Sequence, residues 1–181
     1  MRIISGQYKG RRITPPKKLP VRPTTDMAKE ALFNIINNLY YFDEICVLDL
    51  FAGTGSISYE FASRGTQNIT AVDEDYGCIK FIKETTEAFK MPIQALKNDV
   101  YDFLDKTTLK ANIIFADPPY AFTIEQFSKI HELTFKNNIL EDNGLLIIEH
   151  SKQTNLSFLP YFSYSKSYGG NMFSFFEYTE S

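Results

Sequence analysis

Residues that form covalent or metal cross-links are scarce in this sequence, which has two cysteines and two histidines among 181 residues. Cys46 and Cys78 fall within predicted structural elements and lack the spacing of a paired motif. With only two histidines beside them, no zinc-binding set is expected to assemble. We therefore expect reduced thiols and no metal.

Long apolar runs are also missing. No segment of about 18 apolar residues is present to span a bilayer, and the basic amino end lacks the apolar region of a signal peptide. We expect a soluble, cytoplasmic protein with no membrane partner. The length and the 44% hydrophobic content suffice for one buried core and a small appendage, but not for a second full domain.

Acidic residues are absent from the first 25 positions, whereas the rest of the chain has an excess of them. Residues 1–25 carry a net charge of +7 and the other 156 residues carry −10, within a formal charge of −3 for the chain. Four of the five arginines precede residue 23, and the planar guanidinium suits phosphate oxygens. We predict that residues 1–23 form a basic arm for a polyanion such as RNA, with a solvated basic tail as the alternative. The predicted RNA contacts are Arg2, Lys9, Arg11, Arg12, Arg22, Thr24 and Thr25.

Strand and helix patterns alternate along the chain. Residues 2–14 predict a short twisted hairpin, after which prolines keep the chain extended as far as a helix that begins near Thr24 to Asp26. The apolar face of that helix is predicted to be Ala28, Leu32, Ile35, Ile36 and Leu39. Further strands are predicted at 45–51, 69–73, 93–97, 112–116 and 145–149, helices at 56–64, 76–89, 100–104 and 123–137, and a turn at 142–144.

These patterns predict an α/β fold for residues 24–181. The strands are nearly continuous in apolar residues, which is typical of a parallel sheet covered by helices on both faces. The tail differs, because segments 161–168 and 172–178 flank Gly169, Gly170 and Asn171. This predicts an antiparallel hairpin at one edge of the sheet.

A glycine turn, Gly53-Thr54-Gly55, lies between the strand at 45–51 and the helix that follows it. Glycines there let the backbone approach a ligand, and the helix amino terminus offers free N–H groups. A tight turn without a ligand and a dinucleotide site are the alternatives, but Ser58 stands where the dinucleotide fingerprint needs a third glycine. The acidic Asp49 instead fits the positive amino group of S-adenosylmethionine.

Two acidic residues follow later strands and extend this predicted cofactor site. Asp73 ends its strand, where a carboxylate can accept bonds from both ribose hydroxyls; Glu74 and Asp75 are expected to face solvent. Asp99 can accept from an adenine amino group, although capping of the next helix explains it equally well. The predicted cofactor contacts are Asp49, Phe51, Gly53, Thr54, Gly55, Asp73, Asp99 and Val100.

The segment Asp117-Pro118-Pro119-Tyr120 follows an apolar strand beside this predicted site, and all four residues are candidates for catalysis. An aromatic exocyclic amine is a poor nucleophile, so a site must aim its lone pair at the methyl donor. The Asp117 carboxylate and the Pro118 carbonyl can each accept one N–H, while Tyr120 can stack on the base. Alone the segment suggests an ordinary turn; after Asp49 and the glycine turn it predicts methyl transfer to an amino group.

The sequence resembles the RsmD family of small-subunit ribosomal RNA methyltransferases over nearly its whole length. The matching residues are Arg2-Ile3-Ile4, Gly6, Gly10-Arg11-Arg12, Pro16, Arg22 to Asp26, Glu30 to Ile35, Asp49 to Gly55, Asp117 to Tyr120, Glu149 and Tyr168-Gly169. The resemblance implies a class I S-adenosylmethionine-dependent methyltransferase fold, with a seven-stranded, mostly parallel sheet and a small amino-terminal hairpin. It also implies methylation of the exocyclic N2 of one guanine in 16S ribosomal RNA, free or in an assembled 30S particle.

Three positions depart from the family pattern. Ser5 stands where glycine is usual, and Met27 and Lys29 stand where arginines are common. We expect the first to alter only a turn and the others to remove a guanidinium from the RNA-facing surface.

Other functions account for parts of the sequence. A DNA adenine or cytosine amino-methyltransferase normally needs a target-recognition region, for which 181 residues leave no room. A protein glutamine methyltransferase would carry Asn at position 117 and usually a helical domain ahead of the fold. A non-catalytic RNA-binding module explains the arm but not the acidic residues at strand ends.

Overall fold

Strands and helices alternate along the chain, and the computed structural model describes residues 1–21 and 24–178. The strands are β1 (Cys46–Leu50), β2 (Asn68–Asp73), β3 (Ile93–Lys97), β4 (Ala111–Ala116), β5 (Leu140–Ser151), β6 (Phe162–Tyr168) and β7 (Asn171–Phe176). The helices are α1 (Asp26–Leu39), α2 (Ser56–Ser63), α3 (Tyr76–Phe89), α4 (Val100–Lys106) and α5 (Ile124–Lys136), with a 3-10 turn at Phe42–Glu44.

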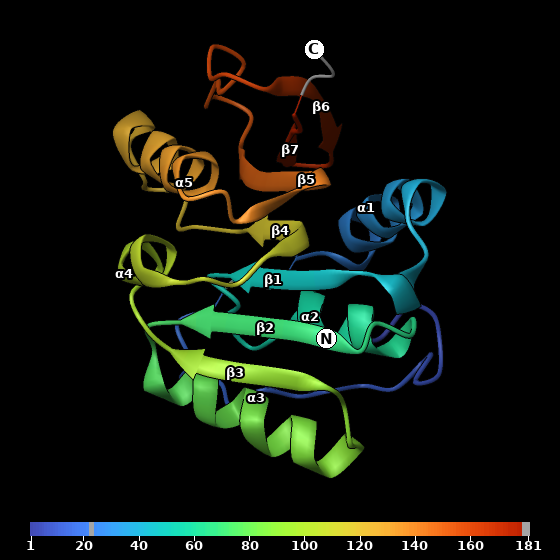
Figure 1. Cartoon of the computed structure of the whole chain (residues 1–181). Helices are drawn as coiled ribbons and strands as arrows, with labels where there is room; N and C mark the ends of the chain where they lie inside the picture. Colours follow the sequence, from blue (N-terminus) through green and yellow to red (C-terminus); the bar gives the residue numbers. More distant parts are fainter. Residues whose placement is uncertain (22–23, 179–181) are drawn as a thin grey trace.

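The strands form one sheet in the order β3-β2-β1-β4-β5-β7-β6 (Figure 1). Strands β1 to β5 are mutually parallel, and β7 runs antiparallel between β5 and β6. This confirms the predicted parallel sheet with a C-terminal antiparallel hairpin. The carboxyl ends of β1, β2 and β4 therefore meet at one edge.

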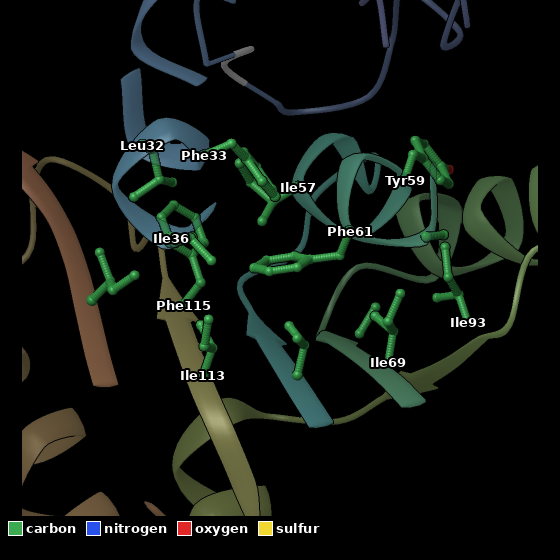
Figure 2. Packing of buried hydrophobic residues seen from close by; sticks show 14 of the residues in the cluster. Leu32, Phe33, Ile36, Ile57, Tyr59, Phe61, Ile69, Ile93, Ile113 and Phe115 are labelled. Carbon is green, nitrogen blue, oxygen red and sulfur yellow. The ribbon is translucent and has the colours of Figure 1, made fainter. Parts of the chain in front are cut away.

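Helices pack on both faces of the sheet because alternate strand residues point to opposite sides. Figure 2 shows Phe33 of α1 and Phe61 of α2 above sheet residues such as Ile113. The two rings meet edge to face, with centroids 4.7 Å apart. On the other face, Phe127 and Ile130 of α5 join a second buried cluster. The strands whose carboxyl ends carry the predicted site are thus covered by helices on both faces of the sheet.

Capping residues explain where the helices begin. The Thr25 side chain accepts a hydrogen bond from the Ala28 amide at the start of α1, at 3.2 Å. The Asp75 carboxylate does the same for Cys78 in α3, at 2.8 Å. The bounds predicted for α3 match the structure, since its cap and its apolar periodicity agree.

The sequence prediction was wrong about Leu39 and about the turn at 142–144. Leu39, assigned to the buried face of α1, is 57% exposed, while Phe33 is fully buried. The predicted turn at 142–144 belongs instead to β5, which already pairs with Ala111 at Leu140. The pairing register between β4 and β5 shifts between Ala111 and Ile113, which accommodates the extra residues of β5.

The amino-terminal segment is held on the body by the buried carboxylate of Glu60. Its oxygens accept hydrogen bonds from the amides of Ile4 and Ser5, at 2.9 and 3.0 Å. Glu60 also forms ion pairs with Arg64, at 2.9 Å, and with Lys29, at 3.7 Å. Within the segment, one antiparallel bridge joins residues 2 and 12.

Lys29 lies in the interior, contrary to its predicted place on the RNA-facing surface. It is 1% exposed, and its ammonium group donates to the Arg2 carbonyl at 2.6 Å and to Ser56 Oγ at 3.3 Å. Burial lowers the pKa of Lys29, while the Glu60 carboxylate opposes this shift. Met27, by contrast, is 63% exposed.

We expect the Glu60→Ala variant to lose about 3–5 kcal/mol of unfolding free energy, because Lys29 and Arg64 would keep buried charge without their partner. Urea denaturation measures this loss. Glu84→Ala is the matched control, since it removes the carboxylate of an exposed ion pair with Lys80. That change should be about 0.5 kcal/mol or less. Equal losses in the two variants would contradict the stabilising role of the buried network.

Cys46 and Cys78 are both free thiols. Burial raises the pKa of Cys78 to about 12, so this thiol remains protonated. None of the helices within residues 1–21 and 24–178 combines the length and apolar character needed to cross a bilayer.

Candidate active site

A cavity of about 760 Å³ opens at the carboxyl ends of β1, β2 and β4. All predicted catalytic residues line it, as do all predicted cofactor contacts except Gly55. The volume is in the usual range for small-molecule sites. The lining residues are Met1, Pro20, Val21, Thr24, Asp49, Phe51, Ala52, Gly53, Thr54, Ser56, Ile57, Asp73, Glu74, Asp75, Cys78, Asp99, Val100, Tyr101, Phe115, Asp117, Pro118, Pro119, Tyr120 and Phe122.

The turn between β1 and α2 uses backbone conformations that favour glycine. Gly53 and Gly55 have φ values of 55° and 87°. A Cβ atom at Gly55 would lie 2.9 Å from the Tyr59 hydroxyl, so this glycine is required for packing beneath the cavity. Phe51 also has a positive φ, 57°, and this strained backbone places it in the cavity lining.

Asp49 lines the cavity and is buried, at 1% exposure. Its Oδ2 accepts a 2.6 Å hydrogen bond from the Ser58 hydroxyl. Burial raises the pKa of Asp49 to about 7, and the nearby Asp117 and Asp73 charges add to the effect while the Ser58 hydrogen bond opposes it. Ser58 therefore orients the Asp49 carboxylate. In the sequence it was noted only because it stands where a dinucleotide fingerprint has its third glycine.

Asp73 supports the glycine turn in addition to lining the cavity. One carboxylate oxygen accepts from the Gly53 amide at 2.8 Å, and the other accepts from the Asp75 amide at 2.9 Å. Each oxygen retains a further lone pair for a ligand hydroxyl. Glu74 and Asp75, expected to face solvent, also line the cavity; Glu74 is exposed and Asp75 is half-buried.

The sequence left two roles open for Asp99, acceptance from an adenine amino group and capping of the next helix, and the structure shows the cap. Its side chain accepts from the Asp102 amide at 3.0 Å and so caps α4. It also lines the cavity, next to the buried Val100.

The segment at 117–120 continues from β4 across the cavity. The Asp117 amide approaches the Leu50 carbonyl of β1 at 3.4 Å. The Pro119 carbonyl accepts from Phe122 at 3.0 Å, which closes a turn. The Tyr120 hydroxyl donates to Oδ1 of Asn171 at 2.9 Å. The structure thus brings the four candidate catalytic residues together with Asp49 and Asp73.

Part of the predicted RNA arm lines the cavity, which the sequence did not indicate. Met1, Pro20 and Val21 of the arm contribute to the lining, as does Thr24 just after it. Val21 lies so close to the glycine turn that a Cβ atom at Gly53 would be 3.2 Å from Val21 Cγ1. Hydrophobic contacts of this kind carry no sequence motif.

Four of the other predicted RNA contacts, Arg2, Lys9, Arg11 and Arg12, are exposed on the amino-terminal segment. Arg2 pairs with Asp26 at 3.2 Å, and the Arg11 guanidinium lies 5.0 Å from the ring centroid of Phe89. Thr25 caps α1. Arg22 lies outside the described residues.

No group of three or more metal-ligating side chains is found in the described part of the chain. The cavity instead combines carboxylates, the amino end of α2 at Ser56 and Ile57, and aromatic rings such as Phe51 and Phe122, whose centroids are 5.6 Å apart. Such a set suits a ligand with a cationic group, hydroxyls and a planar base.

Comparisons with known proteins agree with this geometry. The chain matches a family model described as Conserved hypothetical protein 95 over residues 1–177. YlbH from Bacillus subtilis (strain 168) is 34% identical over 161 residues, covering 86% of this chain and 85% of that protein. Ribosomal RNA small subunit methyltransferase D from Escherichia coli (strain K12) is 30% identical over 167 residues, covering 88% and 79%. The structure of yhhF from Escherichia coli superposes with a TM-score of 0.85 at 28% identity, covering 97% and 96%.

Proposed function

Since the chain belongs to the Conserved hypothetical protein 95 family, an RsmD/YhhF-like family of class I methyltransferases that use S-adenosylmethionine, we propose that it methylates the exocyclic N2 amine of a guanine in small-subunit (16S) ribosomal RNA. One observation carries the proposal: the Asp117–Tyr120 segment and the acidic strand-end residues Asp49, Asp73 and Asp99 line the same cavity. The ribosomal substrate is inferred from the named function of the Escherichia coli relative.

The residues present fit S-adenosylmethionine. Asp49 is a buried carboxylate suited to the ammonium group, and Asp73 offers lone pairs to ribose hydroxyls. We assign the adenine ring to Asp99 and the apolar Val100, which both line the cavity. The cofactor supplies the methyl group on a positively charged sulfur.

The amine is activated by orientation in this proposal. The Asp117 carboxylate and the Pro118 carbonyl each accept one N–H of the guanine amine, so that its lone pair is directed at the methyl group. No covalent bond to the protein forms. Asp117 accepts the proton that the amine loses after transfer, or leaves it to water. The target base must leave its stack to reach Tyr120, which takes up some of the binding energy.

We assign RNA binding to residues 1–23 and expect the Arg11→Ala, Arg12→Ala double variant to bind RNA with a weaker salt dependence. Each lost phosphate contact should lower the slope of log K against log salt by about 0.9 on a duplex or about 0.7 on a single strand. Filter binding across a salt series measures the slope. The control pair is Lys106→Ala, Lys136→Ala at the ends of α4 and α5. An unchanged slope in the arginine variant would assign the arm a structural role alone.

The direct test is methyl transfer in vitro. Purified protein with isotopically labelled S-adenosylmethionine is offered small-subunit ribosomal RNA, either free or in assembled particles. Digestion and chromatography should place the label in N2-methylguanosine. Label in an adenine, a cytosine or a protein glutamine would refute the proposed substrate. Comparison of transfer to free RNA with transfer to assembled particles identifies the preferred form of the RNA.

A further inference from the structure

Tyr120 is attached through its hydroxyl to residues of the C-terminal hairpin. The hydroxyl donates to Oδ1 of Asn171 at 2.9 Å, and Nδ2 of Asn171 donates to Oε1 of Glu149 at 2.6 Å. Asn171 is 7% exposed and Glu149 is 2% exposed. A chain of hydrogen bonds therefore runs from the cavity lining into the buried junction of β5 and β7.

The donor and acceptor roles in these hydrogen bonds follow from the end at Glu149. Oε1 of Glu149 accepts the hydrogen bond from Nδ2 of Asn171, so the amide nitrogen faces inward. The amide oxygen must then face Tyr120, whose hydroxyl has to be the donor. Each member thus specifies the orientation of the next.

The backbone also makes this attachment rigid. Asn171 is the first residue of β7, after the two-residue turn at 169–170, and it pairs with Ser151 of β5. Glu149 pairs with Phe173 two residues further along the same ladder. The hairpin, predicted from sequence only as a sheet edge, thus reaches the catalytic segment.

We propose that Asn171 and Glu149 are positioning residues that hold the Tyr120 ring at one angle, as the surface on which the target base stacks. This inference rests on the proposed function. A tyrosine side chain has few rotatable bonds, and attaching its hydroxyl fixes the remaining freedom of the ring. A base stacked on a fixed ring keeps its amine in line with the methyl donor.

The kinetic test combines Asn171→Ala, Tyr120→Phe and the double variant, assayed at saturating S-adenosylmethionine on small-subunit RNA. Each single variant should lower the single-turnover rate constant by roughly 5- to 10-fold, which corresponds to the net free-energy contribution of about one hydrogen bond. The double variant should lose no more than either single variant, because both remove the same attachment. KM for RNA should stay within about twofold, since phosphate contacts dominate RNA affinity.

Ser174→Ala is the matched control. Its hydroxyl forms a 2.7 Å hydrogen bond with Nε2 of His150, so it also joins β7 to β5 but does not reach Tyr120. Its rate constant should equal that of the wild type. Multiplicative losses in the double variant, or the same loss in Ser174→Ala, would overturn the proposal by showing a general weakening of the hairpin.

A second readout needs no RNA. With 3-fluorotyrosine incorporated, the ¹⁹F resonance of Tyr120 is identified among the 11 tyrosines by its absence from Tyr120→Phe. Asn171→Ala should shift and narrow this resonance, and Ser174→Ala should leave it unchanged. An unchanged resonance in Asn171→Ala would refute the positioning role even in an active enzyme. Absence of methyl transfer by the wild type would instead refute the proposed function, while the resonance still decides whether Asn171 holds the ring.

Discussion

The Asp117→Ala variant is expected to transfer methyl groups roughly 10²- to 10⁴-fold more slowly than the wild type, the range found when a positioned acid–base group is lost. Asp117 lines the cavity at the end of β4 and is one of two proposed acceptors for the guanine amine. Without it the lone pair is no longer aimed, and misalignment of about 1 Å costs about 10²-fold. Single-turnover assays on small-subunit RNA measure the loss.

Two further measurements make this result specific. Binding of S-adenosylmethionine to Asp117→Ala should remain within about twofold of the wild type, because the other contacts of the cofactor are intact. Asp105→Ala removes an exposed carboxylate of α4 and should have wild-type activity, which controls for net charge. Retained turnover in Asp117→Ala would show that the segment at 117–120 is only a structural turn.

Binding of S-adenosylmethionine is expected to weaken about tenfold for each pH unit below about 7 and to be constant at higher pH. The cause is Asp49, whose pKa burial raises from 3.8 to about 7. In the free protein Asp49 keeps its proton below that pH, whereas pairing with an ammonium group requires the ionised form. Isothermal titration between about pH 5.5 and 8.5 in buffers of different ionisation enthalpy measures both affinity and proton release.

Asp49→Asn is the variant that tests this assignment. At about pH 8 it should bind the cofactor roughly 30-fold or more weakly than the wild type, since a buried charge pair is lost. Its affinity should not fall tenfold for each pH unit below about 7.

The raised pKa of Asp49 also makes free wild-type protein less stable as pH rises from about 4 to about 7, because the unfolded chain releases the proton first. Thermal unfolding of Asp49→Asn should lack this contribution. A flat affinity profile in the wild type would contradict the role given to Asp49.

The sequence predicted the features that depend on local patterns. The bounds of α3 and β3 match because each combines a clear period with a boundary signal, the Asp75 cap for α3. The order of acidic residues and glycines also predicted which strand ends share the cavity, because parallel strands end at one edge. Both inferences need only the spacing of neighbouring residues.

Contacts between distant segments could not be predicted in this way. Lys29 pairs with Glu60, which lies on a different helix, so the family pattern of arginines at this position gave the wrong location. Ser58 and Asn171 were not identified as supports for Asp49 and Tyr120, because hydroxyl and amide groups form such bonds without a characteristic motif. Leu39 has the right period for the core, but the helix ends there and leaves it exposed.

The central claim, methylation of a guanine N2 in small-subunit ribosomal RNA, is tested most directly in cells. Ribosomal RNA from strains with and without this protein is digested to nucleosides and short fragments and compared by mass spectrometry, with the Asp117→Ala protein restored as a control. We predict that one N2-methylguanosine is absent from the small-subunit RNA of the deletion strain and of the Asp117→Ala strain, and returns with the wild type. Identical methylation in all the strains would contradict the claim.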